Sequence, residues 1–530
     1  MRTISTPAAP TESKLMANSR RFLRRSAKTL LFFFAWLLFF YLSDRPAPAA
    51  ASDFSFEVSF DKAIHDKPFT GRVYLFFSKR ETPAPRFGPN WFRPEPFLST
   101  QVKDWQPGTP LRIAPGDLEE LRTFPKSFAE VSLDGLYAQA VVRFNPHERE
   151  VGQGAGNGFS NVVRVDAKAP AKTLHLRVDQ LAEPPKFKES KWSKEVVMRS
   201  PLLSDFYGRD VEMKAAVILP ASYYDEPQRR YPVIYQIPGF GGTHFHGRRS
   251  KPVAEKNEEG VEFMRVMLDP NCPRGHHVFA DSANNGPVGQ ALTDELIPHI
   301  DDEFRTIDQP AARFLTGHSS GGWSSLWLQV AYPDFFGGTW STAPDPVDFR
   351  DFQQIDLYRA GENMYVDQDG QKRPLARLNN QPVLWYQDFA DMEWALDYGG
   401  QLHSFEAVFS PRDKAGKPLS VWDRETGAVD TEVAKTWEKY DIRLILEQNW
   451  QTLGPKLAGK IHVFMGDEDT FYLDGATVLL KEALSKLGSD AVVEIYPGKN
   501  HSSLMTPELM ARIRGEMVAA FLREYPLGGP

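Results

Sequence analysis

The hydrophobic pattern of this 530-residue chain changes its period near residue 195. Beyond that point, short apolar and β-branched runs alternate with amphipathic stretches of helical period, which predicts a mainly parallel sheet covered by helices on both faces. The expected strands are 196–199, 212–219, 232–236, 277–280, 312–316, 338–341, 461–465 and 492–496, and the expected helices are 291–304, 321–332, 475–487 and 507–525. Thr506 is the expected N-cap of the last helix, with Pro507 at its first position.

The region before this sheet has a strand-like pattern. Residues 54–60 read FSFEVSF, a strict alternation, and further β-rich runs are separated by turns that contain Pro and Gly. We therefore expect a β-sandwich domain over 52–180. The polar, proline-bearing stretch 181–194 is the expected linker to an α/β domain over 195–527.

A long insertion, residues 349–457, separates the sixth and seventh expected strands. A structureless connection of that length is not credible in a compact domain, so the insertion is expected to have secondary structure of its own. We interpret it as a lid-like subdomain with two or three of its aromatic rings against a pocket. The alternative is a satellite domain whose rings form only its own core. The rings in question are Trp385, Tyr386, Phe389, Trp394, Trp422, Trp437, Tyr440 and Trp450.

The N-terminal segment, residues 1–51, has the features of an export signal. Basic residues at 20–28 precede the apolar run LLFFFAWLLFFYL at 30–42, and small residues follow at 47–51. Because the run is shorter than the roughly 17–25 residues of a spanning helix, cleavage is expected and a membrane anchor is the alternative. The predicted location is periplasmic or secreted, with membrane contact only if the segment stays uncleaved.

Charge and cysteine content narrow the function further. Residues 1–50 hold eight of the 62 basic and two of the 69 acidic residues, which leaves 54 basic against 67 acidic side chains in the rest. An acidic body repels phosphate backbones, so nucleic acid is not an expected partner. Cys272 has no internal disulfide partner. The pairs His244-x-His246 and His276-His277 lack carboxylate or cysteine partners at metal-ligand spacing, so no metal is expected.

Residues 315–322 read LTGHSSGG and contain G-x-S-x-G directly between an expected strand and an expected helix. In this context the small residues permit a sharp turn that holds the Ser319 hydroxyl clear of the sheet. The backbone N–H of Ser320 then becomes one donor to a developing oxyanion. The pattern predicts that Ser319 is a nucleophile.

A serine nucleophile needs a histidine base that is oriented by an acid, and in this type of sheet the chain order is Ser, acid, His. His501, in the loop after the last strand, is the predicted base, while His462 inside a strand is expected to be structural. Asp469 is the preferred acid, with Asp467 and Asp474 as alternatives. If Asp469 is the acid, its carboxylate should lie within hydrogen-bonding distance of a His501 ring nitrogen.

The glycine-rich loop 237–242, IPGFGG, follows the third strand and suits a close backbone approach. We expect the N–H of Phe240 to be the second oxyanion donor, with Gly241 as the alternative. Gly241 and Asp345, the latter just past the sixth strand, are the expected substrate-binding residues. Capping of a loop is the alternative role for Asp345.

The stretch 196–522 resembles the esterase family that includes esterase D, enterochelin esterases and feruloyl esterases. The matching segments are 231–242, 296–300, 317–322, 466–469 and His501. The resemblance implies an α/β-hydrolase fold, here with an N-terminal β-sandwich and a large insertion, and a serine esterase that needs no cofactor. In the family the acid follows the glycine by three residues, which favours Asp469.

This chain departs from the family pattern in two places, so the family's substrates cannot be transferred to it. The family's usual His-Gly is Pro238-Gly239 here, and the insertion is unlike the compact members. The expected partner is a small-molecule or carbohydrate-linked ester. The alternatives are an acyltransferase acting on a sugar or lipid hydroxyl, and a non-catalytic glycan-binding protein.

Overall fold

The computed structural model describes residues 54–114, 121–166, 168, 173–253, 259–397 and 399–526. The predicted export segment, residues 1–51, lies outside the described residues. Within the described ranges, no helix has the length and apolar character needed to cross a membrane.

The N-terminal strands join into one nine-stranded sheet in the order β4-β1-β9-β7-β6-β2-β3-β5, with β8 paired to β6. The sheet curls on itself, because Phe56 of β1 meets Phe77 of the distant strand β2 with ring centroids 5.4 Å apart. The β-sandwich stays a prediction, since all nine strands belong to one hydrogen-bonded sheet. Their bounds are β1 (Ser55–Phe60), β2 (Phe69–Ser78), β3 (Phe97–Trp105), β4 (Leu111–Ile113), β5 (Arg122–Phe124), β6 (Tyr137–Val142), β7 (Gly158–Ser160), β8 (Val163–Arg164) and β9 (Thr173–Leu181).

The second sheet has eight strands in the order β10-β11-β13-β12-β16-β17-β20-β21. β10 and β11 pair antiparallel at one edge, and from β13 onward all neighbours are parallel. The mainly parallel sheet predicted from the alternating pattern is therefore present. Its strands are β10 (Ser193–Arg199), β11 (Glu212–Ile218), β12 (Val233–Ile237), β13 (Met264–Leu268), β16 (Arg313–His318), β17 (Gly338–Thr342), β20 (Ile461–Gly466) and β21 (Val492–Tyr496).

One expected strand was wrong. The fourth strand is β13, whereas the expected strand 277–280 is an irregular segment in which Val278 and Phe279 have positive φ angles. Both segments are buried and apolar, so the hydrophobic pattern alone does not separate them. The charged Arg265 interrupts the apolar run of β13 and weakened its strand signal.

Helices cover both faces of this sheet. The apolar residues of α11 (Pro507–Glu524) share a core with alternate residues of β12, β16, β17 and β20, such as Phe314 and Phe464. The intervening residues face the opposite helices, which are α3 (Val288–Ala291), the π-helical turn η5 (Leu292–Leu296), α4 (Ile297–Glu303), α5 (Ser320–Ala331) and α10 (Asp474–Lys486). Thr506 caps α11 as predicted, since its side chain accepts the N–H of Leu509.

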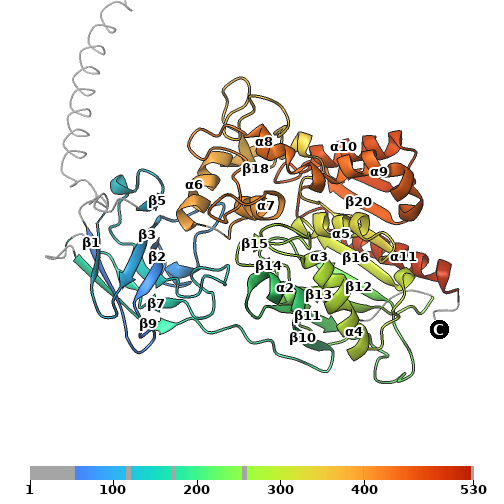
Figure 1. Ribbon diagram of the computed structural model, residues 1–530, viewed down its shortest axis with the longest axis horizontal. Coiled ribbons are helices and arrows are strands. Elements are labelled where there is room, and N and C mark those ends of the chain that lie inside the picture. The colour runs from blue at the N-terminus through green and yellow to red at the C-terminus, as the bar shows by residue number, and fades with distance from the viewer. Residues whose placement is uncertain are drawn as a thin grey trace, which may run out of the picture.

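The insertion between β17 and β20 lies between the two sheets, as the orange segment of Figure 1 shows. It contains its own two-stranded sheet and several helices, as its length required. These elements are β18 (Pro374–Leu378), β19 (Gln381–Trp385), α6 (Tyr386–Leu396), α7 (Gln401–Phe409), α8 (Thr431–Lys435) and α9 (Ile442–Leu457).

The N-terminal sheet packs directly on the insertion. In β2 the side chains of Val73, Leu75 and Phe77 belong to the sheet's own core, while Tyr74 and Phe76 share a core with the insertion. Three polar contacts reinforce this face: Ser99 Oγ donates to Ala395 O at 2.7 Å, Tyr74 Oη to Leu396 O at 3.0 Å, and Arg122 Nη1 to Asp397 Oδ1 at 2.9 Å. The end of α6 is therefore fixed against the N-terminal sheet.

A buried ion-pair cluster joins the entry of the insertion to the start of its last helix, α9. Arg443 Nε lies 3.0 Å from Asp348 Oδ2, and Arg443 Nη2 lies 3.4 Å from Asp441 Oδ2. The side chain of Arg443 is 5% exposed and both carboxylates are fully buried. Asp441 also accepts the N–H of Phe349 at 3.0 Å. These contacts hold the entry of the insertion against the start of α9, its last helix.

We predict that Arg443→Met destabilises the protein by about 3–5 kcal/mol, because it leaves the buried Asp441 carboxylate without a cation and leaves Asp348 with Arg350 alone. Urea denaturation followed by tryptophan fluorescence measures the loss. Arg199→Met is the matched control, since its ion pair with Asp210 joins side chains that are 55% and 80% exposed, and exposed pairs contribute about 0–1 kcal/mol. Equal effects of the two substitutions would contradict a clamp at the base of the insertion.

Candidate active site

Ser319 lies at the sharp turn between β16 and α5, with φ 62° and ψ −127°. A positive φ is strained for a residue with a side chain, and such strain is retained where packing over-determines the turn. The packing here leaves no space: an added Cβ would lie 2.0 Å from Gly321 O at Gly317 and 2.0 Å from Ile237 O at Gly321. The two glycines of the motif are therefore required by backbone contacts on both sides of Ser319.

His501 and Asp469 are hydrogen-bonded, as the sequence analysis expected. His501 Nδ1 lies 2.7 Å from Asp469 Oδ2, and the Asp469 side chain is fully buried. The other Asp469 oxygen accepts the N–H of Phe471 at 2.8 Å. The two alternative acids are engaged elsewhere: Asp467 accepts the N–H of Gly498 at 2.7 Å, and Asp474 pairs with Arg377 at 2.8 Å.

The imidazole of His501 sits in a mixed electrostatic environment. Burial lowers its pKa, but the charge and the hydrogen bond of Asp469 outweigh burial, so the pKa lies above the ordinary value of 6.5. The neighbouring His318 ring, 4.6 Å from that of His501, has a pKa lowered to about 4 by burial and by His501. His318 is thus neutral near pH 7, and His501 is the protonatable partner of the pair.

Ser319 and His501 line one cavity of about 270 Å³. Among the described residues no hydrogen bond joins their side chains, and such catalytic contacts often tighten only when substrate binds. Apolar and aromatic side chains form most of the wall. The lining residues are Trp91, Gly239, Phe240, His318, Ser319, Asp345, Gln353, Leu375, Phe389, Gln401, Leu402, Phe405, Phe471, Leu473 and His501.

The loop after β12 approaches the serine closely. An added Cβ at Gly239 would lie 3.1 Å from both His318 O and Ser319 Cβ. Phe240 lines the cavity beside Ser319. Ser320 is the first residue of α5, and N–H groups in the first turn of a helix have no partner within it. Both expected oxyanion donors therefore come from backbone next to Ser319.

Gly241 is not among the described residues that line this cavity, and its expected role in substrate binding stays a prediction. It has φ +81° and faces a second cavity of about 1000 Å³. The turn closed by the hydrogen bond from Gly242 N to Gly239 O directs the chain away from Ser319 after Phe240.

Asp345 lines the cavity but contacts the serine turn. Its Oδ2 accepts the hydroxyl of Ser320 at 2.6 Å and the side-chain amide of Gln401 at 3.4 Å, and its N–H donates to Ser319 O at 3.3 Å. Burial raises the pKa of this carboxyl to about 6. Asp345 thus stabilises the turn through its hydrogen bonds to Ser319 and Ser320.

Some aromatic residues of the insertion line the cavity, as expected for a lid, and others form the insertion's own core. Of the eight singled out, Phe389 lines the cavity, while Trp422 and Trp437 are buried in the insertion's own core. Phe405, which was not singled out, also lines the cavity. Trp91 was missed because its loop lies in the N-terminal region, more than two hundred residues from the serine motif. An aromatic pair in an otherwise polar, proline-rich loop was its signal.

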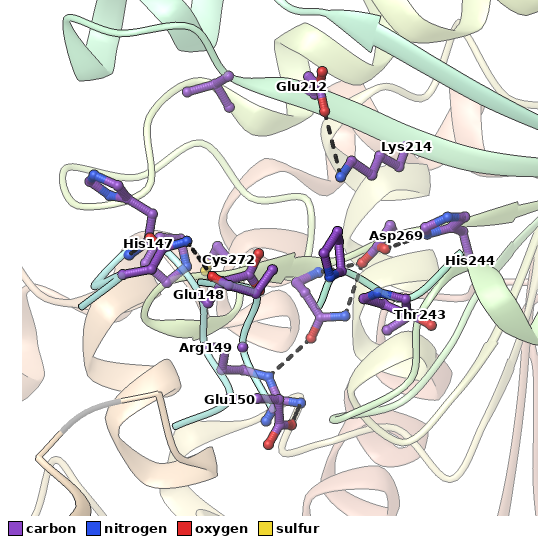
Figure 2. A pocket seen from close by; sticks show the side chains of 18 of the residues that line it. His147, Glu148, Arg149, Glu150, Glu212, Lys214, Thr243, His244, Asp269 and Cys272 are labelled. Carbon is purple, nitrogen blue, oxygen red and sulfur yellow. Dashed lines mark hydrogen bonds and ion pairs between the residues drawn. The ribbon is translucent and has the colours of Figure 1, made fainter. Parts of the chain in front are cut away.

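His244, the first member of the H-x-H pair, has structural contacts. His244 is buried, with Nδ1 2.5 Å from Asp269 Oδ2 and Nε2 2.9 Å from Glu195 Oε1. It borders the second cavity, where Figure 2 shows it beside Asp269, with Arg149 and Glu150 below them in the view. In the part of the chain that the structure describes, no group of three or more His, Cys, Asp or Glu side chains could hold a metal ion.

Several solved structures are similar to this chain at low identity. A ferulic acid esterase is 13% identical, with 62% of this chain and 99% of that chain covered and a TM-score of 0.38. An S-formylglutathione hydrolase from Agrobacterium tumefaciens is 16% identical over 62% and 94%, with a TM-score of 0.36. A fluorophosphonate-binding serine hydrolase from Staphylococcus aureus is 12% identical over 62% and 98%, also at 0.36.

No curated protein matches the chain. The profile of one protein family, described as Putative esterase, matches residues 209–501. The matched segment contains Ser319, Asp469 and His501 together with the loop after β12. Since it spans more than half of the 530 residues, the chain belongs to the Putative esterase family of α/β hydrolases.

Proposed function

We propose that this protein is a serine esterase that hydrolyses a carboxylic ester through an acyl-enzyme at Ser319. The observation that carries the proposal is the convergence on one cavity of Ser319, in its strained turn, and of His501, hydrogen-bonded to the buried Asp469. A nucleophile and an oriented base at one cavity are the requirements for acyl transfer.

In the acylation step, Ser319 Oγ attacks the ester carbonyl carbon and His501 Nε2 takes the hydroxyl proton. Asp469 accepts the Nδ1 hydrogen and stabilises the imidazolium cation. The N–H groups of Phe240 and Ser320 donate to the carbonyl oxygen as it becomes negative. The intermediate collapses, His501 returns the proton to the leaving alcohol, and the acyl group remains on Ser319.

In the second step a water molecule attacks the acyl-enzyme. His501 accepts a proton from the water, and the same two N–H groups stabilise the second oxyanion. Collapse releases the carboxylic acid and returns the proton to Ser319 Oγ. No step uses a metal ion or an organic cofactor.

We also propose that the insertion is a specificity lid over this cavity. Its support is that Gln353, Leu375, Phe389, Gln401, Leu402 and Phe405 all line the wall. Its clamped base and its packing on the N-terminal sheet favour a fixed cover rather than a swinging one. The signal-like residues 1–51 support a periplasmic or secreted location, where the substrate is a small or carbohydrate-linked ester.

We predict that Ser319→Ala and His501→Ala each lower ester hydrolysis by about 10⁴-fold or more, because the nucleophile and its base act as one unit. Steady-state kinetics on purified protein measure the loss. Ser502→Ala, an exposed serine beside His501, is the matched control and should keep near-normal activity. Normal turnover by folded Ser319→Ala would refute the mechanism.

Asp469→Asn should lower kcat/KM by about 10³–10⁴-fold, since an amide holds the wrong histidine tautomer. Asp467→Asn should change it less than tenfold, because the Asp467 carboxylate is hydrogen-bonded to the N–H of Gly498 and not to His501.

The pH profile provides a second readout of the same pair. His501 must be neutral to act as a base, so wild-type activity should fall as pH drops through its raised pKa. The residual activity of Asp469→Asn should fall at a lower pH, because the charge that raises the pKa is gone. An unshifted profile would assign the acid to another carboxylate.

Phe389→Ala and Phe405→Ala should change the preference between long-chain and acetate esters by about tenfold. Trp394→Ala is the control, since this insertion residue is 37% exposed and outside the cavity. Initial rates on a series of ester chain lengths measure the preference. A loss of thermal stability with an unchanged preference would favour the satellite-domain interpretation.

A further inference from the structure

The N-terminal sheet contributes one residue to the wall of the Ser319 cavity. Trp91 belongs to the loop between β2 and β3, and its ring lies 5.5 Å from that of Phe240 and 5.0 Å from that of Phe389, centroid to centroid. Phe240 belongs to loop 237–242, which holds an expected oxyanion donor, and Phe389 belongs to the insertion. Trp91 therefore contacts two different elements of the cavity wall.

The next residue extends this contact toward the base. The Phe92 ring lies 6.1 Å from that of Phe471, which in turn meets the His501 ring edge-on at 5.1 Å. Aromatic pairs at these distances stabilise one another beyond the burial of their surface. The loop thus contacts the cavity wall at Phe240 and Phe389 through Trp91, and at Phe471 through Phe92.

The loop that carries Trp91 is held in a defined shape. Asn90 Oδ1 accepts the N–H groups of Phe92 and Arg93 at 3.0 and 3.1 Å, which closes a tight turn around Trp91. At the base of the loop, Lys79 N donates to Glu95 Oε1 at 2.7 Å. The position of Trp91 is therefore set by the loop itself before any ligand binds.

The partner of Trp91 is fixed as well. Phe389 lies on α6, whose end is bonded to β2 and β3 through Leu396 and Ala395. The same sheet therefore sets both the position of Trp91 and that of the helix it faces. A gap held at both sides selects a ligand by size.

We propose that Trp91 is a specificity-determining residue that selects esters with a large uncharged apolar group, aryl or long alkyl, over small esters. This inference rests on the proposed esterase function. The chemistry of the wall supports it: beside Trp91 stand Phe240, Phe389, Phe405 and Phe471, and the ionisable lining groups are Asp345 and the two histidines. Apolar surface buried against these rings would lower the barrier for a large ester and leave the reaction of a small ester such as methyl acetate unaffected.

The test compares three esters by pH-stat titration: methyl acetate, methyl 3-phenylpropanoate with a large acyl group, and 2-phenylethyl acetate with a large alcohol. In Trp91→Ala, kcat/KM for at least one phenyl ester should fall about tenfold relative to methyl acetate. Trp91→Phe should recover most of the ratio, since it retains an aromatic face. Phe87→Ala, on the same loop but lining the second cavity, is the matched control and should leave all ratios unchanged.

Ratios that stay within twofold of wild type for both phenyl esters, in folded Trp91→Ala, would overturn the proposal. If that variant has a lowered melting midpoint, Trp91→Leu repeats the test with a smaller loss of volume. Failure of the esterase function itself would look different, since wild-type protein would then turn over none of the three esters, and it would overturn this inference with it.

Discussion

The turn at Ser319 is packed so tightly that backbone occupies the space where side chains would otherwise be. Gly317 meets the carbonyl of Gly321, and Gly321 meets the carbonyl of Ile237 on the neighbouring strand β12. Ser319 N donates to Thr342 O of β17 on the other side, at 3.1 Å. The strained φ of Ser319 is thus maintained by two flanking strands. His501, Asp469 and loop 237–242 are arranged around the Ser319 turn.

Loop 237–242, which packs against Ser319, is itself supported by contacts with the N-terminal region. The Arg149 guanidinium, from the loop after β6, lies 4.9 Å from the centroid of the Phe240 ring. Its Nε donates to Asn271 Oδ1 at 3.1 Å, and Asn271 Nδ2 donates to Gly242 O at 2.9 Å. Loop 237–242 therefore contacts the loop after β6 at two points, directly at Phe240 and through Asn271 at Gly242. The N-terminal region acts as a support for the site as well as one of its walls.

Local patterns predicted much of this arrangement from the sequence. The strand–motif–helix order identified Ser319, and loop position after the last strands identified Asp469 and His501, which lie 2.7 Å apart. The fourth strand could not be identified, because two buried apolar segments competed and Arg265 interrupted the true one. The place of Trp91 at the cavity and the contact of Arg149 with Phe240 were missed as well, although the aromatic pair Trp91-Phe92 marked its loop. They depend on the docking of the N-terminal sheet, which leaves no periodic signal in either partner.

The most direct measurement of the central claim is covalent labelling of the nucleophile. The protein is treated with a fluorophosphonate, digested, and its peptides are analysed by mass spectrometry. The account predicts one phosphonylated residue, Ser319, with labelling abolished in Ser319→Ala and greatly slowed in His501→Ala. Labelling of another serine, or a wild-type protein that stays unlabelled at millimolar reagent while folded, would contradict it.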